Sequence, residues 1–189
     1  MFQNPTAGLI GGFLALSLTL SAPVLAKFTA TEASELDAEA KTTLEQFAAE
    51  TKGAEEVFAN AKGVLVCPKI RKAGAGVGAE RGQCVLTSGA DEPLYYQATA
   101  LKAGAILGVS SHSMILVINT DKALANFTSG KREWEFGLDA SVAVAKIGVG
   151  GDLDTTNLKR DIVSFIFGEQ GLIADVTWEG SRFKKLDVE

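Results

Sequence analysis

Apolar residues recur at helical spacing near the start of the chain, within residues 32–53. They stand at intervals of four, four and three positions, which places them on one face of an α-helix: Leu36, Ala40, Leu44 and Phe47. Thr31 or Ser34 is expected to cap this helix, and Gly53 is expected to end it. A second, short helix is predicted over residues 54–61.

From residue 63 onward the pattern changes to short apolar or alternating segments bounded by turn-forming residues, which is typical of β-strands. The predicted strands are 64–67, 73–79, 83–87, 94–98, 101–109, 114–118, 134–138, 141–149, 162–167, 172–178 and 183–186. One short helix is predicted between them, over residues 121–127. The segment 114–118 is apolar at every position, so we expect it to be buried on both faces. The segment 73–79 alternates Gly with small residues, so another backbone can approach it closely.

This succession of helices and then many short strands indicates the fold class. We expect an α+β protein in which a curved antiparallel β-sheet or partial barrel carries a few packed helices, with the N-terminal helices first. No linker or low-complexity segment divides residues 27–189. We therefore expect these residues to form a single domain.

Residues 1–26 contain no charged side chain and include an apolar run over residues 7–20. Val24 and Ala26 occupy the −3 and −1 positions of a cleavage site, so the segment 1–26 is predicted to be a secretory signal peptide. The alternative is an uncleaved membrane anchor, for which the run is short. The expected location is exported, in the periplasm or associated with the cell envelope.

Charged residues are distributed unevenly, although the formal net charge is only −5. Residues 32–56 are acidic, whereas residues 62–81 carry several cations against a single carboxylate, that of Glu80. The cations of this segment are Lys62, Lys69, Arg71, Lys72 and Arg81. We place the central ones at a loop tip between two strands, where they can attract phosphate head groups in spite of the net charge. Ordinary solvated surface is the alternative, and the lack of interleaved aromatic residues argues against nucleic-acid binding.

The two cysteines, Cys67 and Cys84, lie on neighbouring predicted strands. Disulfides persist in the compartments that exported proteins reach, so a single bridge between them is geometrically feasible. Two buried free thiols are the alternative, because an unpaired cysteine packs as a small hydrophobic residue. Two cysteines are too few for a closed zinc site, and no metal is expected.

Catalytic candidates are few. His112 is the single histidine, and it lies between two predicted strands, where we expect a solvent-exposed turn residue. The Gly74-x-Gly76-x-Gly78 run is followed by another strand, whereas a nucleotide-binding loop leads into a helix. Asp152 and Asp154 supply fewer ligands than a calcium loop needs. We therefore expect a protein that is not an enzyme and uses no cofactor.

The order of several short motifs resembles that of the SYLF family, from about residue 36 to the C-terminus. The motifs are Ala61-Lys62-Gly63-Val64-Leu65-Val66-Cys67-Pro68, the run 72–78, Tyr95-Tyr96, and the segments 104–108, 120–127, 137–143 and 167–172. The resemblance implies binding to membrane lipids, which are phosphoinositides for eukaryotic members, and some fungal relatives also bind actin. Cys67 and Cys84 replace residues that are usually apolar or Gly in the family, which favours a disulfide here.

The N-terminal helix departs from the lipid-binding type, because it is acidic where lipid-contacting amphipathic helices are usually basic. The leading hypothesis is therefore an exported, non-enzymatic domain that binds anionic phospholipid head groups or membranes through its basic segment. The alternative is a protein-interaction or envelope-scaffold module without lipid specificity.

Overall fold

The structure is a computed structural model of the 189-residue chain, and it describes residues 27–129, 133–135, 143–145, 160–171 and 180–189. The predicted signal peptide lies outside the described residues, as do Asp152 and Asp154 and the predicted strand 172–178. The helices are α1 (Ala30–Glu50), α2 (Ala54–Ala59) and α3 (Asp121–Thr128). The strands are β1 (Gly63–Thr87), β2 (Leu94–Ile118), β3 (Glu133–Glu135), β4 (Ala143–Ala145), β5 (Ile162–Gly171) and β6 (Arg182–Leu186).

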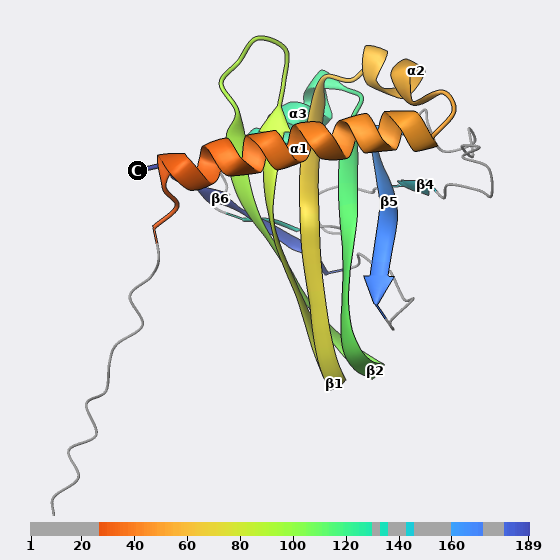
Figure 1. Ribbon diagram of the computed structural model, residues 1–189. Coiled ribbons are helices and arrows are strands. Elements are labelled where there is room, and N and C mark those ends of the chain that lie inside the picture. Colours follow the sequence, from red (N-terminus) through yellow and green to blue (C-terminus); the bar gives the residue numbers. More distant parts are fainter. Residues whose placement is uncertain (1–26, 130–132, 136–142, 146–159, 172–179) are drawn as a thin grey trace, which may run out of the picture.

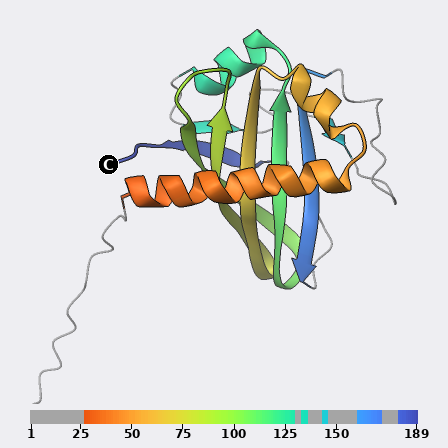
Figure 2. The same cartoon turned by 45° about the horizontal axis from the view of Figure 1, so that its top comes forward.

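Helix α1 lies across the strands of the sheet (Figures 1 and 2). Its N-cap is Thr29, which lies two residues before Thr31 and five before Ser34, because Thr29 and Glu32 form a reciprocal capping box. The Thr29 amide and hydroxyl both donate to the Glu32 carboxylate, which lowers the pKa of that carboxyl. The face predicted from the apolar spacing is the buried one, with Leu36, Ala40 and Phe47 directed at the sheet.

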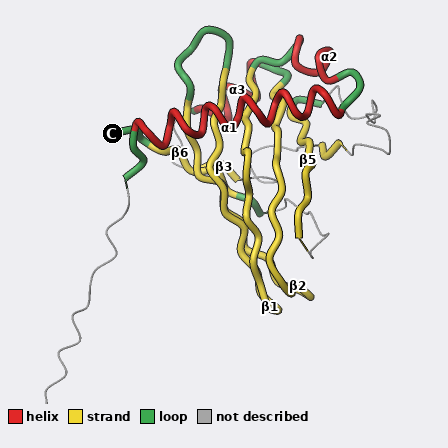
Figure 3. The backbone as a smooth tube through the Cα atoms, in the orientation of Figure 1, coloured by secondary structure: helices red, strands yellow, loops and turns green. Residues whose placement is uncertain are grey.

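Strands β1 and β2 form one long antiparallel pair that bends back on itself (Figure 3). The pairing runs from Gly63 opposite Ile118 to Leu86 opposite Leu94, so each strand spans segments that the sequence pattern had divided into separate strands. The bend in β1 is at Gly76, whose φ of 79° favours glycine. We call the stretches of β1 before and after Gly76 its first and second arms, and the bent end of both strands the tip.

The remaining strands extend the sheet from β2. Strand β5 pairs with the part of β2 that follows the bend, and β6 pairs with the part that precedes it. Strand β3 continues the sheet beyond β6, and β4 adds to β5 in parallel orientation. The result is a curled, six-stranded, mainly antiparallel half-barrel, which confirms the predicted α+β fold class.

Two apolar layers hold the sheet, one on each of its faces. Inside the curl, Leu65, Met114 and Leu116 meet the aromatic rings of α3, β3 and β6, and their neighbours Val66 and Ile115 face α1 on the other side. The aromatic rings inside the curl are Phe127, Trp134 and Phe183. All five residues of the segment 114–118 are 0 % exposed, which confirms that this apolar run is buried on both faces.

A polar contact also joins α1 to the sheet. The Tyr95 hydroxyl of β2 donates to the Asp37 carboxylate of α1 at 3.0 Å. Partial burial, together with the hydrogen bond to this negative charge, raises the pKa of Tyr95 to about 12. The pKa of Tyr95 in the folded protein therefore lies above its ordinary value of 10. The stabilisation from this hydrogen bond is fully present below pH 10 and is lost as the pH rises through about 12.

The two arms of β1 contact each other face to face. Cys67 of the first arm is joined to Cys84 of the second by a disulfide, so the bridge that the sequence left open is formed. Nearer the tip, the Lys72 ammonium lies 3.7 Å from the Glu80 carboxylate, and both side chains are only 2 % exposed. Between these pairs Gly82 packs against the backbone of Lys69 and Ile70, where an added methyl group would lie 2.8 Å from the Lys69 carbonyl oxygen.

Replacing both cysteines by alanine should lower the free energy of unfolding by about 3 kcal/mol, since the bridge closes a loop between residues that are 17 positions apart. Thermal unfolding with and without a thiol reductant measures this. Reductant should lower the melting temperature of the natural chain and leave that of the Cys67→Ala/Cys84→Ala variant unchanged. Equal melting temperatures for the two proteins without reductant would contradict a stabilising role of the bridge.

Glu80→Gln should destabilise the fold by about 3–5 kcal/mol, because it leaves the Lys72 charge buried without its carboxylate. The double variant Lys72→Met/Glu80→Leu should recover most of that loss, since it removes both buried charges. Urea denaturation of the three proteins gives the comparison. A Glu80→Gln variant as stable as the natural chain would show that this pair does not hold the arms together.

Candidate functional site

The exposed cations of β1 meet at one cleft of about 270 Å³ beneath α1. Its polar lining consists of Lys69, Arg71, Arg81, Glu39, Gln83 and Gln97. Leu36 of α1 and Pro68 and Gly82 of β1 complete the wall. We call this the basic cleft, because three cationic side chains share it with one carboxylate. The cations come from both arms of β1, so the bend of the strand is what brings them together.

Lys69 and Arg71 reach the cleft because of an irregularity in β1. The register with β2 shifts between Cys67 and Ile70, which is a β-bulge that contains Pro68. The Pro68 carbonyl accepts a hydrogen bond from the Ser113 hydroxyl at 2.8 Å. Past the bulge, exposed and buried residues alternate, so Lys69 and Arg71 point outward while Ile70 and Lys72 point into the curl.

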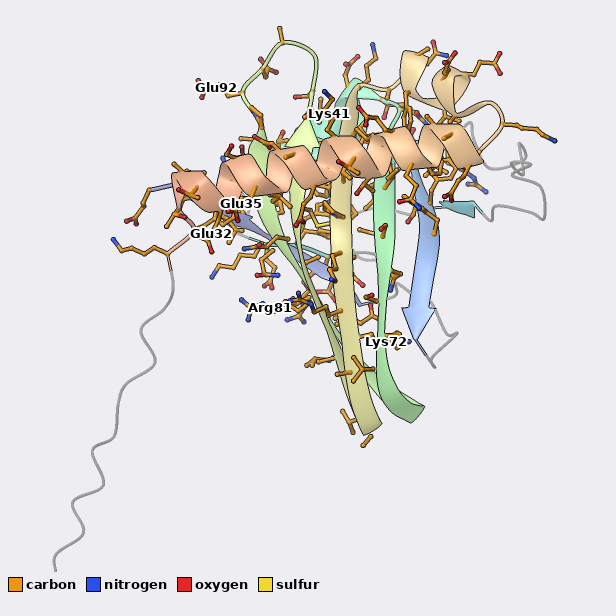
Figure 4. The ribbon with its side chains drawn as sticks, in the orientation of Figure 1. Glu32, Glu35, Lys41, Lys72, Arg81 and Glu92 are labelled. Carbon is orange, nitrogen blue, oxygen red and sulfur yellow. A yellow bond between two sulfur atoms is a disulfide. The ribbon has the colours of Figure 1, made fainter. Side chains whose placement is uncertain are left out.

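Arg81 is held in place by a neighbouring amide. Its Nε donates to the Gln97 side-chain oxygen at 3.2 Å, and the Gln97 amide nitrogen donates to the carbonyl oxygens of Gly82 and Ala98. Since Gln97 binds Arg81 through Nε, both terminal Nη groups of the guanidinium remain oriented for a further acceptor. Figure 4 shows Arg81 pointing outward from the strands below α1.

The cleft has the electrostatic character of an anion site. Within the part of the chain that the structure describes, no ion pair engages Lys69, Arg71 or Arg81. A guanidinium offers a planar fork of donors that matches the oxygens of a phosphate, and an ammonium adds a compact positive charge. Two arginines and a lysine around one cleft can therefore hold a phosphate group without a metal ligand set.

The structure separates two of the predicted site residues from the other three. Lys72 lies inside the curl with Glu80, at 2 % exposure, and does not reach the basic cleft. The Lys62 ammonium lies 3.9 Å from the Asp121 carboxylate at the N-terminus of α3, away from the cleft. The prediction that Lys69, Arg71 and Lys72 lie at a loop tip is wrong. They lie within β1, because the β-bulge lets the strand continue past Pro68.

Sequence reasoning missed the contributions of Glu39 and Gln97, which line the basic cleft from α1 and β2. No local motif marks them, since they join the cations only through the docking of α1 and the pairing of β1 with β2. The prediction of an exposed turn for His112 is wrong. This residue is 4 % exposed within β2, because the strand continues through the segment 110–113. It stands opposite Ile70 in the strand pair.

The described residues show neither a metal-binding cluster nor a membrane-spanning helix. They contain no group of three or more histidine, cysteine or acidic side chains arranged to hold a metal ion. Within the same residues, the helices are all too short or too polar to cross a bilayer.

Comparison with known proteins links the second half of the chain to one family. No curated protein matches the chain. Residues 99–187 match the family model Ysc84, described as Las17-binding protein actin regulator. The match begins on β2, so the cations of the basic cleft lie on the N-terminal side of it. Residues 99–187 are thus similar to the Ysc84 family, and this match confirms the predicted SYLF resemblance.

Proposed function

We propose that this chain is an exported, non-enzymatic protein that binds anionic phospholipid head groups in the basic cleft, at the periplasmic or envelope-facing surface of a membrane. The observation that carries the proposal is the convergence of Lys69, Arg71 and Arg81, from two arms of one bent strand, on a single cleft. The apolar, uncharged segment 1–26 supports export. The SYLF resemblance implies lipid binding as the family property.

The arrangement suits a phosphate group on a surface better than a small ligand in solution. The cleft is partly open to solvent and its charged lining is mainly cationic, so a phosphate group presented on a surface can reach it. Each lysine or arginine near an anionic membrane contributes on the order of 1 kcal/mol of binding free energy. Since the chain carries a net charge of −5, this attraction depends on where the cations lie and not on the overall charge.

Charge reversal of the cleft provides the test. The variant Lys69→Glu/Arg71→Glu/Arg81→Glu should bind vesicles of phosphatidylcholine with phosphatidylglycerol at least about 100-fold more weakly than the natural chain. Co-sedimentation across a salt series measures the affinity. Binding by the natural chain should fall as salt rises, because exposed charges are screened.

A matched control reverses three cations elsewhere, in Lys41→Glu/Lys62→Glu/Lys122→Glu. Both variants have the same net charge, so only the position of the cations differs. Lys41 lies on the side of α1 away from Arg81 (Figure 4), and the other two lie near α3. Equal loss of binding in both variants would remove the cleft from the proposal. No binding of the natural chain to any vesicle would overturn lipid binding itself.

A protein-interaction module is the second candidate, since the family description names a binding protein. Chemical cross-linking of envelope extracts, followed by purification of the chain, distinguishes the two. One stoichiometric protein partner, together with an absence of vesicle binding, would favour the second candidate.

A further inference from the structure

The tip of the bent strand pair exposes large apolar side chains to solvent. Val77 and Val109 are each 67 % exposed, and Leu101 is 81 % exposed. The described residues contain one other large apolar side chain of this kind, Val188 near the C-terminus at 43 %. Three of the four thus gather at one end of the molecule. An exposed apolar cluster of this type marks an interaction surface.

Charge is absent from the tip itself. The segment 73–79 of β1 and the segment 103–111 of β2 contain no charged residue. A charged group would have to lose its hydration to enter an apolar phase, at a high cost in free energy. The tip has no such group, and its exposed side chains in β1 include several small ones. It is therefore a narrow, uncharged projection.

On β1 and β2 the charged side chains next to the tip are cationic, whereas Glu133 and Glu135 of β3 line a cleft with Leu101. Arg71 and Arg81 stand five residues before and after Gly76, and both side chains are exposed. The single carboxylate of β1 and β2, that of Glu80, is buried with Lys72. The tip thus carries a cationic collar, and no acidic residue of these two strands is exposed around it.

The acidic helix α1 lies away from the tip (Figure 1). Helix α1 holds six acidic residues against one lysine, and it crosses the sheet far from the tip (Figure 1). Glu92, in the loop between β1 and β2, also lies away from the tip (Figure 4). An anionic surface therefore attracts the collar and repels α1, which would turn the tip toward the surface.

From these features we infer that the tip inserts into the interfacial region of an anionic bilayer, while the basic cleft holds head groups above it. The inference rests on the proposed function and adds the depth and orientation of binding. Five residues of strand span about 16 Å. Interfacial segments enter a bilayer by about 5–10 Å, so the long side chains of Arg71 and Arg81 meet the phosphate layer when the tip is immersed. The partner that the tip contacts is the lipid bilayer.

Threonine substitutions test the tip without changing its charge or strand propensity. The variant Val77→Thr/Leu101→Thr/Val109→Thr should bind phosphatidylglycerol-containing vesicles at least about tenfold more weakly. The loss should be greatest at high salt, because apolar insertion is not screened whereas the head-group attraction is. Val188→Thr removes the fourth exposed apolar side chain and should bind as the natural chain does.

A lipid monolayer of the same composition reports insertion directly. The natural chain should raise the surface pressure, the threonine variant should not, and the charge-reversed cleft variant should regain insertion when it is added at high concentration. Circular dichroism of each variant checks that it is folded.

The outcomes separate the two proposals. If the natural chain binds vesicles and the threonine variant matches it in affinity and surface pressure, insertion by the tip is wrong and head-group binding stands. If the natural chain binds no vesicle, both proposals fall. If the threonine variant loses a dimer seen by sedimentation while its vesicle binding is unchanged, the tip is a contact between two copies, and the inference is overturned.

Discussion

The contact between the two arms of β1 is the constraint on which the rest of the structure depends. Gly82 lets the second arm touch the backbone of Lys69 and Ile70, where any larger residue would push the arms apart. The disulfide and the buried Lys72–Glu80 pair hold the arms at that separation from either side of the contact. Because β2 pairs with β1 along both arms, it must bend as well. The half-barrel is thus the outcome of one strand folded upon itself.

Because of this geometry, the sheet has apolar side chains on both faces, and both faces must be shielded from solvent. The inner face is filled by side chains such as Met114 and Leu116, together with the rings of Phe127 and Trp134. The outer face is covered by α1, whose Phe47 ring packs edge-on against Phe165 of β5. Towards the tip, none of the described helices covers the strands (Figure 1), and apolar side chains are exposed there.

The division of charge follows from the same arrangement. An acidic helix lies at one end and a cationic collar lies near the other, so a chain of net charge −5 still presents a positive surface to a partner. Burial of the Lys72–Glu80 pair removes from that surface the one carboxylate that β1 and β2 carry. The basic cleft therefore lies between α1 and the tip (Figure 1). The basic cleft suits a phosphate group, and the tip suits the apolar layer of a bilayer beneath the phosphates.

The sequence by itself determined the α+β class, the helical face with Leu36 and Phe47, and the double burial of the segment 114–118, because these depend on local apolar periodicity. It also included the three cations of the basic cleft in a predicted group of five. Only the tertiary structure decided that Lys69, Arg71 and Arg81 converge while Lys72 turns inward, and that His112 is buried. The reason is that the bend at Gly76 and the bulge at Pro68 set which face of the strand each side chain occupies. The alternation of apolar and polar residues along the chain does not reveal that the two arms of one bent strand contact each other.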